Sequence, residues 1–260
     1  MPPRVLAASR EKEDRVLKIN DANNFRRTLA GLCLIAAPLA FGGSDVIRLS
    51  IEGGVREGSE QLAAIAANSG LWQVATVLNM VGVVLFVPAV LGLIHLLRER
   101  SAVLGHLGGG LALIGFLGWA AHNAKYYGFM GAVSTSEINR GEMVRFIEHW
   151  VMSPDTIVYV LMFLVGGLLG MLLLSIGLYR ARVTYRWAAL FLLGTVLYIV
   201  NSFTPASESM LAVGVLHALI AVGLGATGVG VLAMSDADWG RLRVASAAET
   251  APVGAQPWTQ

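Results

Sequence analysis

Long apolar runs alternate with short polar segments along the chain. A helix needs about 20 mostly apolar residues to cross a hydrocarbon core roughly 30 Å thick, because each helical residue rises about 1.5 Å. Inside lipid, backbone N–H and C=O groups must be paired within their own segment, so such runs form helices rather than strands. The pattern predicts an all-α, polytopic membrane protein, a six-transmembrane-helix bundle. The six predicted spans, of which the fifth is the weakest, are 28–48, 70–97, 103–125, 156–179, 186–203 and 210–234.

Composition and charge extend this prediction. Hydrophobic residues make up 55% of the chain and charged residues 14%, against roughly 25% charged residues in soluble domains. With the N-terminus inside, 14 of the 19 Lys and Arg residues fall on the cytoplasmic side, which is the bias that sets membrane orientation. Both termini are therefore predicted to be cytoplasmic. The net charge of +2 comes from basic residues dispersed at membrane borders, which argues against nucleic-acid binding.

Three regions follow from the same pattern. Residues 1–27 are predicted to be a charged cytoplasmic tail, and residues 28–235 the six-helix transmembrane domain. Residues 236–260 are predicted to be a disordered cytoplasmic tail, of which 244–260 are rich in Ala, Pro, Gly and Thr. The single Cys33 allows no intrachain disulfide.

Polar residues are concentrated in the predicted outer half of the helices. His217 lies about seven residues into the last span, roughly 10 Å from its start. Ionisable groups at such a depth usually face the bundle interior or a wet cavity. Asp45 and Asp155 could serve acid or base roles there, but we expect Arg48 and Lys125 simply to neutralise them. We predict an outward-facing polar cavity whose ligand-binding residues are Asp45, Asn79, His122, Lys125, Asp155 and His217.

The outer loop 126–154 is expected to cover this cavity. Ser134 and Glu137 in it have capping-box spacing, and the apolar stripe that follows predicts a short amphipathic helix that acts as a lid. A weaker alternative is a metal site made by His122, His149 and His217, because three histidines can hold zinc with one open position. No HxxxH or HExxH spacing supports that site, so the sequence predicts no metal and no cofactor.

Glycine is frequent, at 30 residues, and much of it lies within the predicted spans. Gly105 with Gly109, and Gly166 with Gly170, have the GxxxG spacing that lets helix backbones approach closely in lipid. Two interpretations stand: packing inside the bundle, or pairing with a second copy or another membrane protein. Pro88 predicts a kink in the second span.

Two glycine- and leucine-rich stretches stand out in the second and third spans. They run from Leu71-Trp72-Gln73 through Leu91-Gly92-Leu93-Ile94-His95-Leu96-Leu97-Arg98, and over Leu104-Gly105-His106-Leu107-Gly108-Gly109. Together they resemble uncharacterised bacterial multi-pass membrane proteins grouped as domains of unknown function. The resemblance covers 28–235 and implies a bacterial inner-membrane location, without implying an activity or site residues.

The function expected from these observations is binding or movement of a small molecule or lipid through the polar cavity. One alternative is an accessory or assembly subunit of a membrane complex, which would use its glycine-rich helix faces. The other is an intramembrane enzyme, with or without a metal. Besides the lipid bilayer, the expected partners are a small ligand and a second membrane protein or copy.

Overall fold

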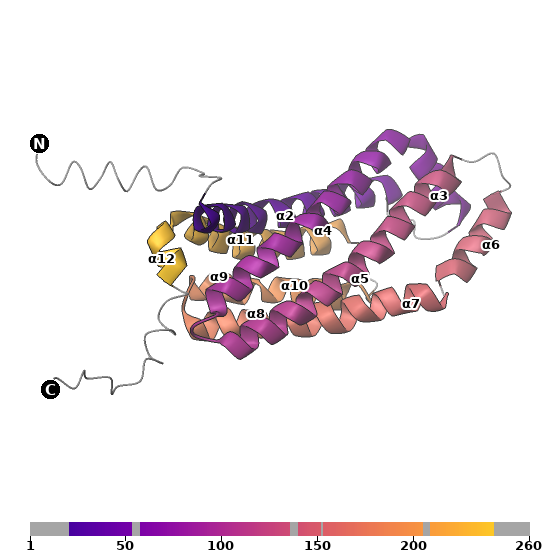
Figure 1. Cartoon of the computed structure of the whole chain (residues 1–260). Helices are drawn as coiled ribbons and strands as arrows, with labels where there is room; N and C mark the ends of the chain where they lie inside the picture. Colours follow the sequence, from indigo (N-terminus) through magenta and orange to yellow (C-terminus); the bar gives the residue numbers. More distant parts are fainter. Residues whose placement is uncertain (1–20, 54–57, 136–139, 152, 205–208, 242–260) are drawn as a thin grey trace, which may run out of the picture.

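The computed structural model describes residues 21–53, 58–135, 140–151, 153–204 and 209–241, and every regular element in these ranges is a helix (Figure 1). Most of both predicted tails, residues 1–20 and 242–260, lies outside the described residues. The elements are α2 (Ala22–Glu52), α3 (Ser59–Ala67), α4 (Ser69–Leu97), α5 (Ala102–Ser134), α6 (Arg140–Val151), α7 (Pro154–Leu161), the π-helix η1 (Met162–Gly167), α8 (Leu168–Ala181), α9 (Arg186–Phe191), α10 (Leu193–Asn201), α11 (Met210–Ala233) and α12 (Asp236–Arg241).

Within the described part of the chain, five helices are long and apolar enough to cross a membrane: α2, α4, α5, α11 and the continuous helix formed by α7, η1 and α8. This confirms an all-α chain with several membrane-compatible helices. The fifth predicted span differs, because α9 and α10 cover only Arg186–Asn201. A helix of that length is about 24 Å long, shorter than a hydrocarbon core of roughly 30 Å.

Local sequence explains where several helices begin and end. The Asp21 side chain accepts hydrogen bonds from the backbone N–H groups of Asn23 and Asn24 and so caps the start of α2. Gly53 ends the same helix in the left-handed conformation, with φ of 57°. Pro154 lies in the first turn of α7, where its missing N–H leaves no hydrogen bond unmade.

The two ends of the bundle are distinct (Figure 1). We call the end that carries α3 and α6 the outer end, and the end that carries α12 the inner end, after the predicted orientation. At the inner end, buried Arg27 of α2 forms an ion pair with Asp236 of α12, at 3.0 Å between Nε and Oδ1. Arg27 also donates hydrogen bonds to the carbonyl oxygens of Leu232 and Met234. The first and last described helices therefore meet at the same end of the molecule.

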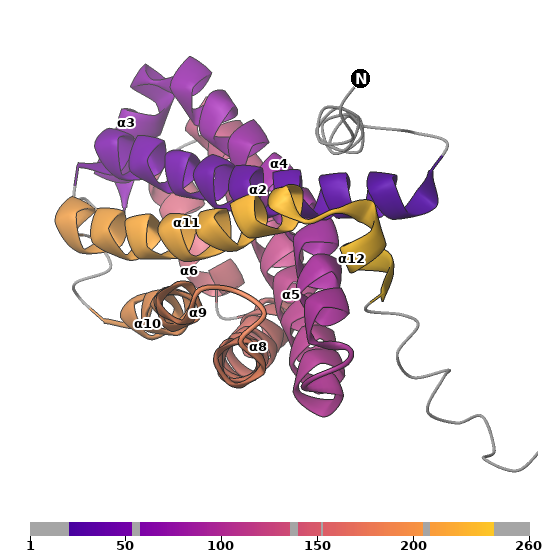
Figure 2. The same ribbon diagram turned by 90° about the vertical axis from the view of Figure 1, so that its left-hand side faces the viewer.

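Glycine lets several helices approach at backbone distance. A Cβ on Gly115 of α5 would overlap the backbone nitrogen of Gly167 in η1, and one on Gly170 of α8 would overlap the backbone nitrogen of Ala112. Figure 2 shows α11 running alongside α2, where a Cβ on Gly228 would lie 2.7 Å from the carbonyl oxygen of Gly31. The predicted GxxxG pair of Gly166 and Gly170 is thus covered by α5, within the bundle.

Alanine at Gly115 should destabilise the bundle by about 1–3 kcal/mol, because its Cβ would collide with the backbone of η1. Gly110→Ala on the same helix is the matched control. A Cβ at Gly110 has nothing within 4 Å, and alanine favours helix over glycine. Thermal unfolding in detergent micelles, followed by circular dichroism, measures the effect. Equal melting temperatures for the two variants would contradict this account of the α5–η1 contact.

The outer end has its own apolar cluster, made by Ile51, Leu62, Ile65, Trp72, Ala75, Tyr127 and Met130 from α2, α3, α4 and α5. The predicted loop 126–154 is largely helical here. Its first part continues α5 to Ser134, whose hydroxyl donates to the carbonyl of Gly131 within the same helix. The other end of the predicted capping box, Glu137, lies outside the described residues. α6 then packs Val144 and Ile147 against the outer apolar cluster, as an amphipathic helix would.

Candidate functional site

Three charged residues of α2 lie on one helix face near its outer end. Asp45, Arg48 and Glu52 are separated by three and four positions, which brings their side chains to one face of the helix. Arg48 Nη1 lies 2.6 Å from Glu52 Oε2, and Arg48 Nε lies 3.6 Å from Asp45 Oδ1. Both carboxylates are buried, while the Arg48 side chain is 23% exposed. A cation between two carboxylates offsets part of their desolvation cost.

The second carboxylate oxygen of Asp45, Oδ2, contacts side chains from two other helices. The Tyr198 hydroxyl of α10 donates a 2.6 Å hydrogen bond to Asp45 Oδ2. His217 of α11 places its Nε2 atom 3.4 Å from the same oxygen, within ion-pair distance but without forming a hydrogen bond. The opposite ring atom, Nδ1, lies 2.9 Å from the Val213 carbonyl oxygen. We call Asp45, Arg48, Glu52, Tyr198 and His217 the charged cluster.

Neutral polar groups extend the charged cluster toward the outer end. Glu52 Oε1 accepts hydrogen bonds from Gln61 Nε2 at 3.0 Å and from the Tyr126 hydroxyl at 3.1 Å. Ser44 donates to the Ala75 carbonyl and lies 3.3 Å from the Tyr127 hydroxyl oxygen. Asp45 and Glu52 therefore each contact the Arg48 guanidinium on one side and a neutral donor on the other.

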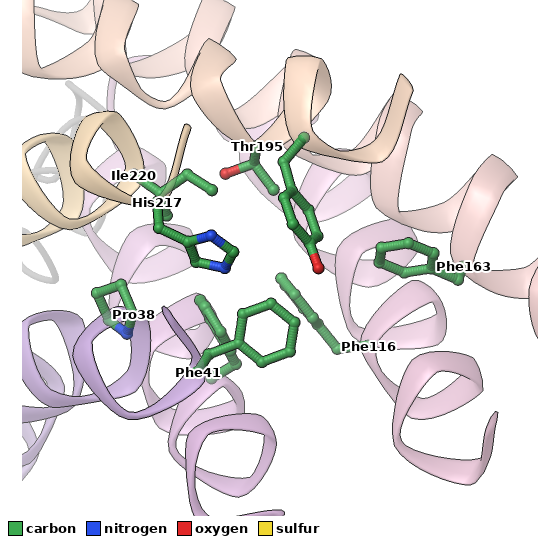
Figure 3. A pocket seen from close by; sticks show the side chains of 9 residues that line it. Pro38, Phe41, Phe116, Phe163, Thr195, His217 and Ile220 are labelled. Carbon is green, nitrogen blue, oxygen red and sulfur yellow. The ribbon is translucent and has the colours of Figure 1, made fainter. Parts of the chain in front are cut away.

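A small cavity of about 20 Å³ adjoins the charged cluster. Figure 3 shows the rings of Phe41, Phe116, Phe163 and His217 directed toward its centre. Among the described residues, neither His217 Nε2 nor buried Thr195 Oγ1 has a hydrogen-bond partner. The volume suits about one water molecule. The full lining is Pro38, Phe41, Phe86, Phe116, Phe163, Thr195, Tyr198, His217 and Ile220.

Interrupted helices border this cavity on several sides. Pro38 lies inside α2 and removes one backbone hydrogen bond there. Phe163 belongs to the π-helix η1, and Thr195 follows the break between α9 and α10 at Leu192. Such interruptions are found where helices bend and frequently at functional sites. The cavity therefore lies beside interruptions in three helical segments, at Pro38, η1 and Leu192.

The six predicted ligand-binding residues do not gather in one cup. The structure brings Asp45 and His217 together in the charged cluster. Asn123 Nδ2 donates to Asn79 Oδ1 at 2.8 Å in a separate buried pair. Lys125 and Asp155 form an ion pair on the surface, where 53% of the Asp155 side chain is exposed.

The predicted metal histidines also have different surroundings. His122 lies between Trp119 and Tyr126, with ring centroids 5.4 and 6.3 Å away, whereas His149 is exposed on α6 and His217 is buried. Across the described ranges, no group of three or more His, Cys, Asp or Glu side chains is placed to hold a metal ion. The alternative of a shared three-histidine site thus has no geometric support there.

The sequence alone did not point to several residues of the site. The i, i+3, i+7 spacing of Asp45, Arg48 and Glu52 was a usable signal for one charged helix face. Tyr198 and Thr195 gave no signal, because a tyrosine or threonine in an apolar segment is common in any helix bundle. Their role follows from the rotation of α10 toward α2 and α11, which hydropathy does not encode.

Comparison of the chain with protein-family models, with curated proteins and with solved structures found no match.

Proposed function

We propose that this chain is an integral protein of the bacterial inner membrane that binds or moves a small molecule at the cavity beside Asp45 and His217. The observation that carries the proposal is the meeting of Asp45, Tyr198 and His217, from three helices, at a cavity bordered by interrupted helices. Ionisable groups inside membrane helices are costly, and those that occur mark ligand or ion pathways. Stability alone gives no reason for them, because apolar side chains would pack there at lower cost.

The lining of the cavity limits the class of ligand. Its walls are aromatic and aliphatic, and the lining residues that carry polar side-chain atoms are Thr195, Tyr198 and His217. A largely apolar small molecule or a lipid chain, with at most one polar group, fits this lining. The present volume of about 20 Å³ holds only water, so such a ligand requires the helices to separate. The interruptions at Pro38, η1 and Leu192 are the points at which they can bend.

The orientation proposed is six crossings with both termini cytoplasmic. The ion pair between Arg27 and Asp236 supports an even number of crossings, because it joins the first and last described helices at one end. Five long helices alone would leave these two residues at opposite ends. The short helix α9–α10 therefore supplies the sixth crossing, and the bias of Lys and Arg assigns the inner end to the cytoplasm.

Native mass spectrometry of protein released gently from its own membrane tests this function. We expect a discrete bound mass in the unaltered protein and about tenfold lower occupancy in Tyr198→Phe, which keeps the ring but removes one hydrogen bond to Asp45. Lys125→Ala is the control, because Lys125 belongs to the separate surface pair.

Two results would count against a ligand at this cavity. One is a bound mass that persists unchanged in Tyr198→Phe, and the other is equal loss in Lys125→Ala. A retained protein partner would instead favour an accessory subunit. That alternative has one favourable feature, an uncovered line on α11 where Val215, Val222 and Val229 are exposed and a Cβ added at Gly225 would meet nothing within 4 Å.

A further inference from the structure

The charged cluster holds one more negative charge than positive charge when the His217 ring is neutral. This count takes Asp45 and Glu52 as carboxylates, and Arg48 is the cation that both contact. The tyrosines that face these carboxylates, Tyr198 from α10 and Tyr126 from α5, are neutral donors. An uncompensated charge in a buried cluster is strongly unfavourable, so the cluster is completed by one added positive charge.

The hydrogen bonding of His217 determines where that charge can be held. A carbonyl oxygen only accepts hydrogen bonds, so the contact to Val213 requires the proton of the neutral ring to be on Nδ1. Nε2 then carries the lone pair, and it lies 3.4 Å from Asp45 Oδ2 without hydrogen-bond geometry. Two acceptor atoms at this distance repel, and a single proton on Nε2 turns this repulsion into an ion pair.

We propose that Asp45 and His217 form a proton-binding site, in which one proton bound at Nε2 closes an ion pair between α2 and α11. Tyr198 completes the site from α10 by holding Asp45 Oδ2. The groups that face the pair are Arg48 and Glu52 on α2 and, through Ser44, Tyr127 on α5. Among the described residues, α4 contributes to this region the uncharged carbonyl of Ala75, which accepts from Ser44.

Protonation of this pair acts on the cavity beside it. His217 and Tyr198 both line the cavity, so the bound proton holds α2, α10 and α11 together around it. Loss of the proton restores the repulsion between Nε2 and Oδ2 and favours separation of α11 from α2. The proton is thus the ion that would couple to the ligand of the proposed function. This coupling depends on that function, whereas proton binding itself does not.

Nitrogen NMR of isotope-labelled histidine in lipid nanodiscs tests the site directly. The chain has five histidines, and the His217→Gln variant identifies the signal of His217 by its absence. Across a titration from about pH 9 to about pH 5, we expect Nδ1 of His217 to carry a proton throughout and Nε2 to gain one. Asp45→Asn should weaken this proton binding by about tenfold or more, because the partner charge is lost.

Tyr198→Phe is a second variant, and it should change the proton affinity of His217 in the opposite direction. Without the hydroxyl, the charge on Asp45 Oδ2 is less stabilised, so His217 should bind its proton roughly two- to fivefold more tightly. Unchanged signals from the other four histidines verify that each variant is folded. The proposal is overturned if Nε2 carries the proton of the neutral ring, if Nε2 stays bare throughout the titration, or if Asp45→Asn leaves the titration unchanged.

The two proposals can fail separately. A bound mass lost in Tyr198→Phe, together with an Nε2 atom that stays bare, would leave ligand binding standing and remove proton binding. The expected titration without any bound mass would leave the proton site standing and remove a tightly bound ligand. Because Tyr198→Phe is expected to lower ligand occupancy and raise proton affinity, one variant separates the two effects.

Discussion

Replacing Arg48 with methionine should lower the free energy of unfolding by about 3 kcal/mol or more, the largest effect expected at the outer end. The substitution keeps a long side chain but leaves the buried carboxylates of Asp45 and Glu52 without their shared cation. The effect should be measured by reversible unfolding in mixed micelles as the fraction of SDS is raised. Arg145→Met is the control, because Arg145 is an exposed residue of α6.

A double variant separates charge from packing in this result. If the loss comes from an unpaired carboxylate, adding Glu52→Gln to Arg48→Met should recover part of the stability, because the amide carries no charge to leave unpaired. If the methionine merely packs poorly, the second change should make the protein less stable still. A double variant no more stable than Arg48→Met would therefore contradict the electrostatic account.

Replacing Arg27 with methionine should destabilise the inner end by a similar amount, about 3 kcal/mol. Arg27 is 1% exposed and forms an ion pair with Asp236. It also donates to the carbonyl groups of Leu232, in the last turn of α11, and of Met234, which follows that helix. Its loss removes the cation from the link between α2 and α12 and leaves the hydrogen bonds from Asn24 Nδ2 to Asp236. The neighbouring Arg26 is exposed on the same helix, so Arg26→Met is a closely matched control.

The same unfolding titration measures the stability of Arg27→Met and of its control, Arg26→Met. Limited proteolysis adds a local readout, because Arg27 pairs with Asp236 at the start of α12 and this start should become more accessible in Arg27→Met. Arg26→Met should change the free energy of unfolding by no more than about 0.5 kcal/mol. It should leave the cleavage pattern unchanged. Equal behaviour of the two variants would show that the buried guanidinium does not hold the inner end together.

The consequences of these two arginines differ although their chemistry is the same. At the inner end, the Arg27 guanidinium contacts one carboxylate and donates to two backbone carbonyls. Its single positive charge is matched there by a single negative charge. Arg48 contacts two carboxylates, those of Asp45 and Glu52. The Asp45 oxygen Oδ2 also lies 3.4 Å from His217 Nε2. The excess negative charge therefore lies at the outer end, beside the cavity, and it is there that proton binding is proposed.

Much of the fold could be predicted because it depends on properties that each segment carries alone. The apolar runs at 70–97 and 210–234 become α4 and α11 almost residue for residue, since length and hydropathy suffice to mark a helix in lipid. The prediction was less accurate where a helix leaves the apolar region. α5 continues to Ser134 because Tyr127 and Met130 pack in the outer apolar cluster, a contact with residues distant in sequence.

The sequence by itself determined that the chain is helical, how many apolar segments it has and which polar residues are unusual for their depth. Only the tertiary structure decided which of these residues meet. Asp45 and His217 share a site with Tyr198, whereas Lys125 pairs with Asp155 on the surface. The physical reason is that hydropathy fixes the depth of a residue but leaves the rotation of its helix free. That rotation is set by close backbone contacts such as those of Gly115 and Gly228, which form only when the helices pack.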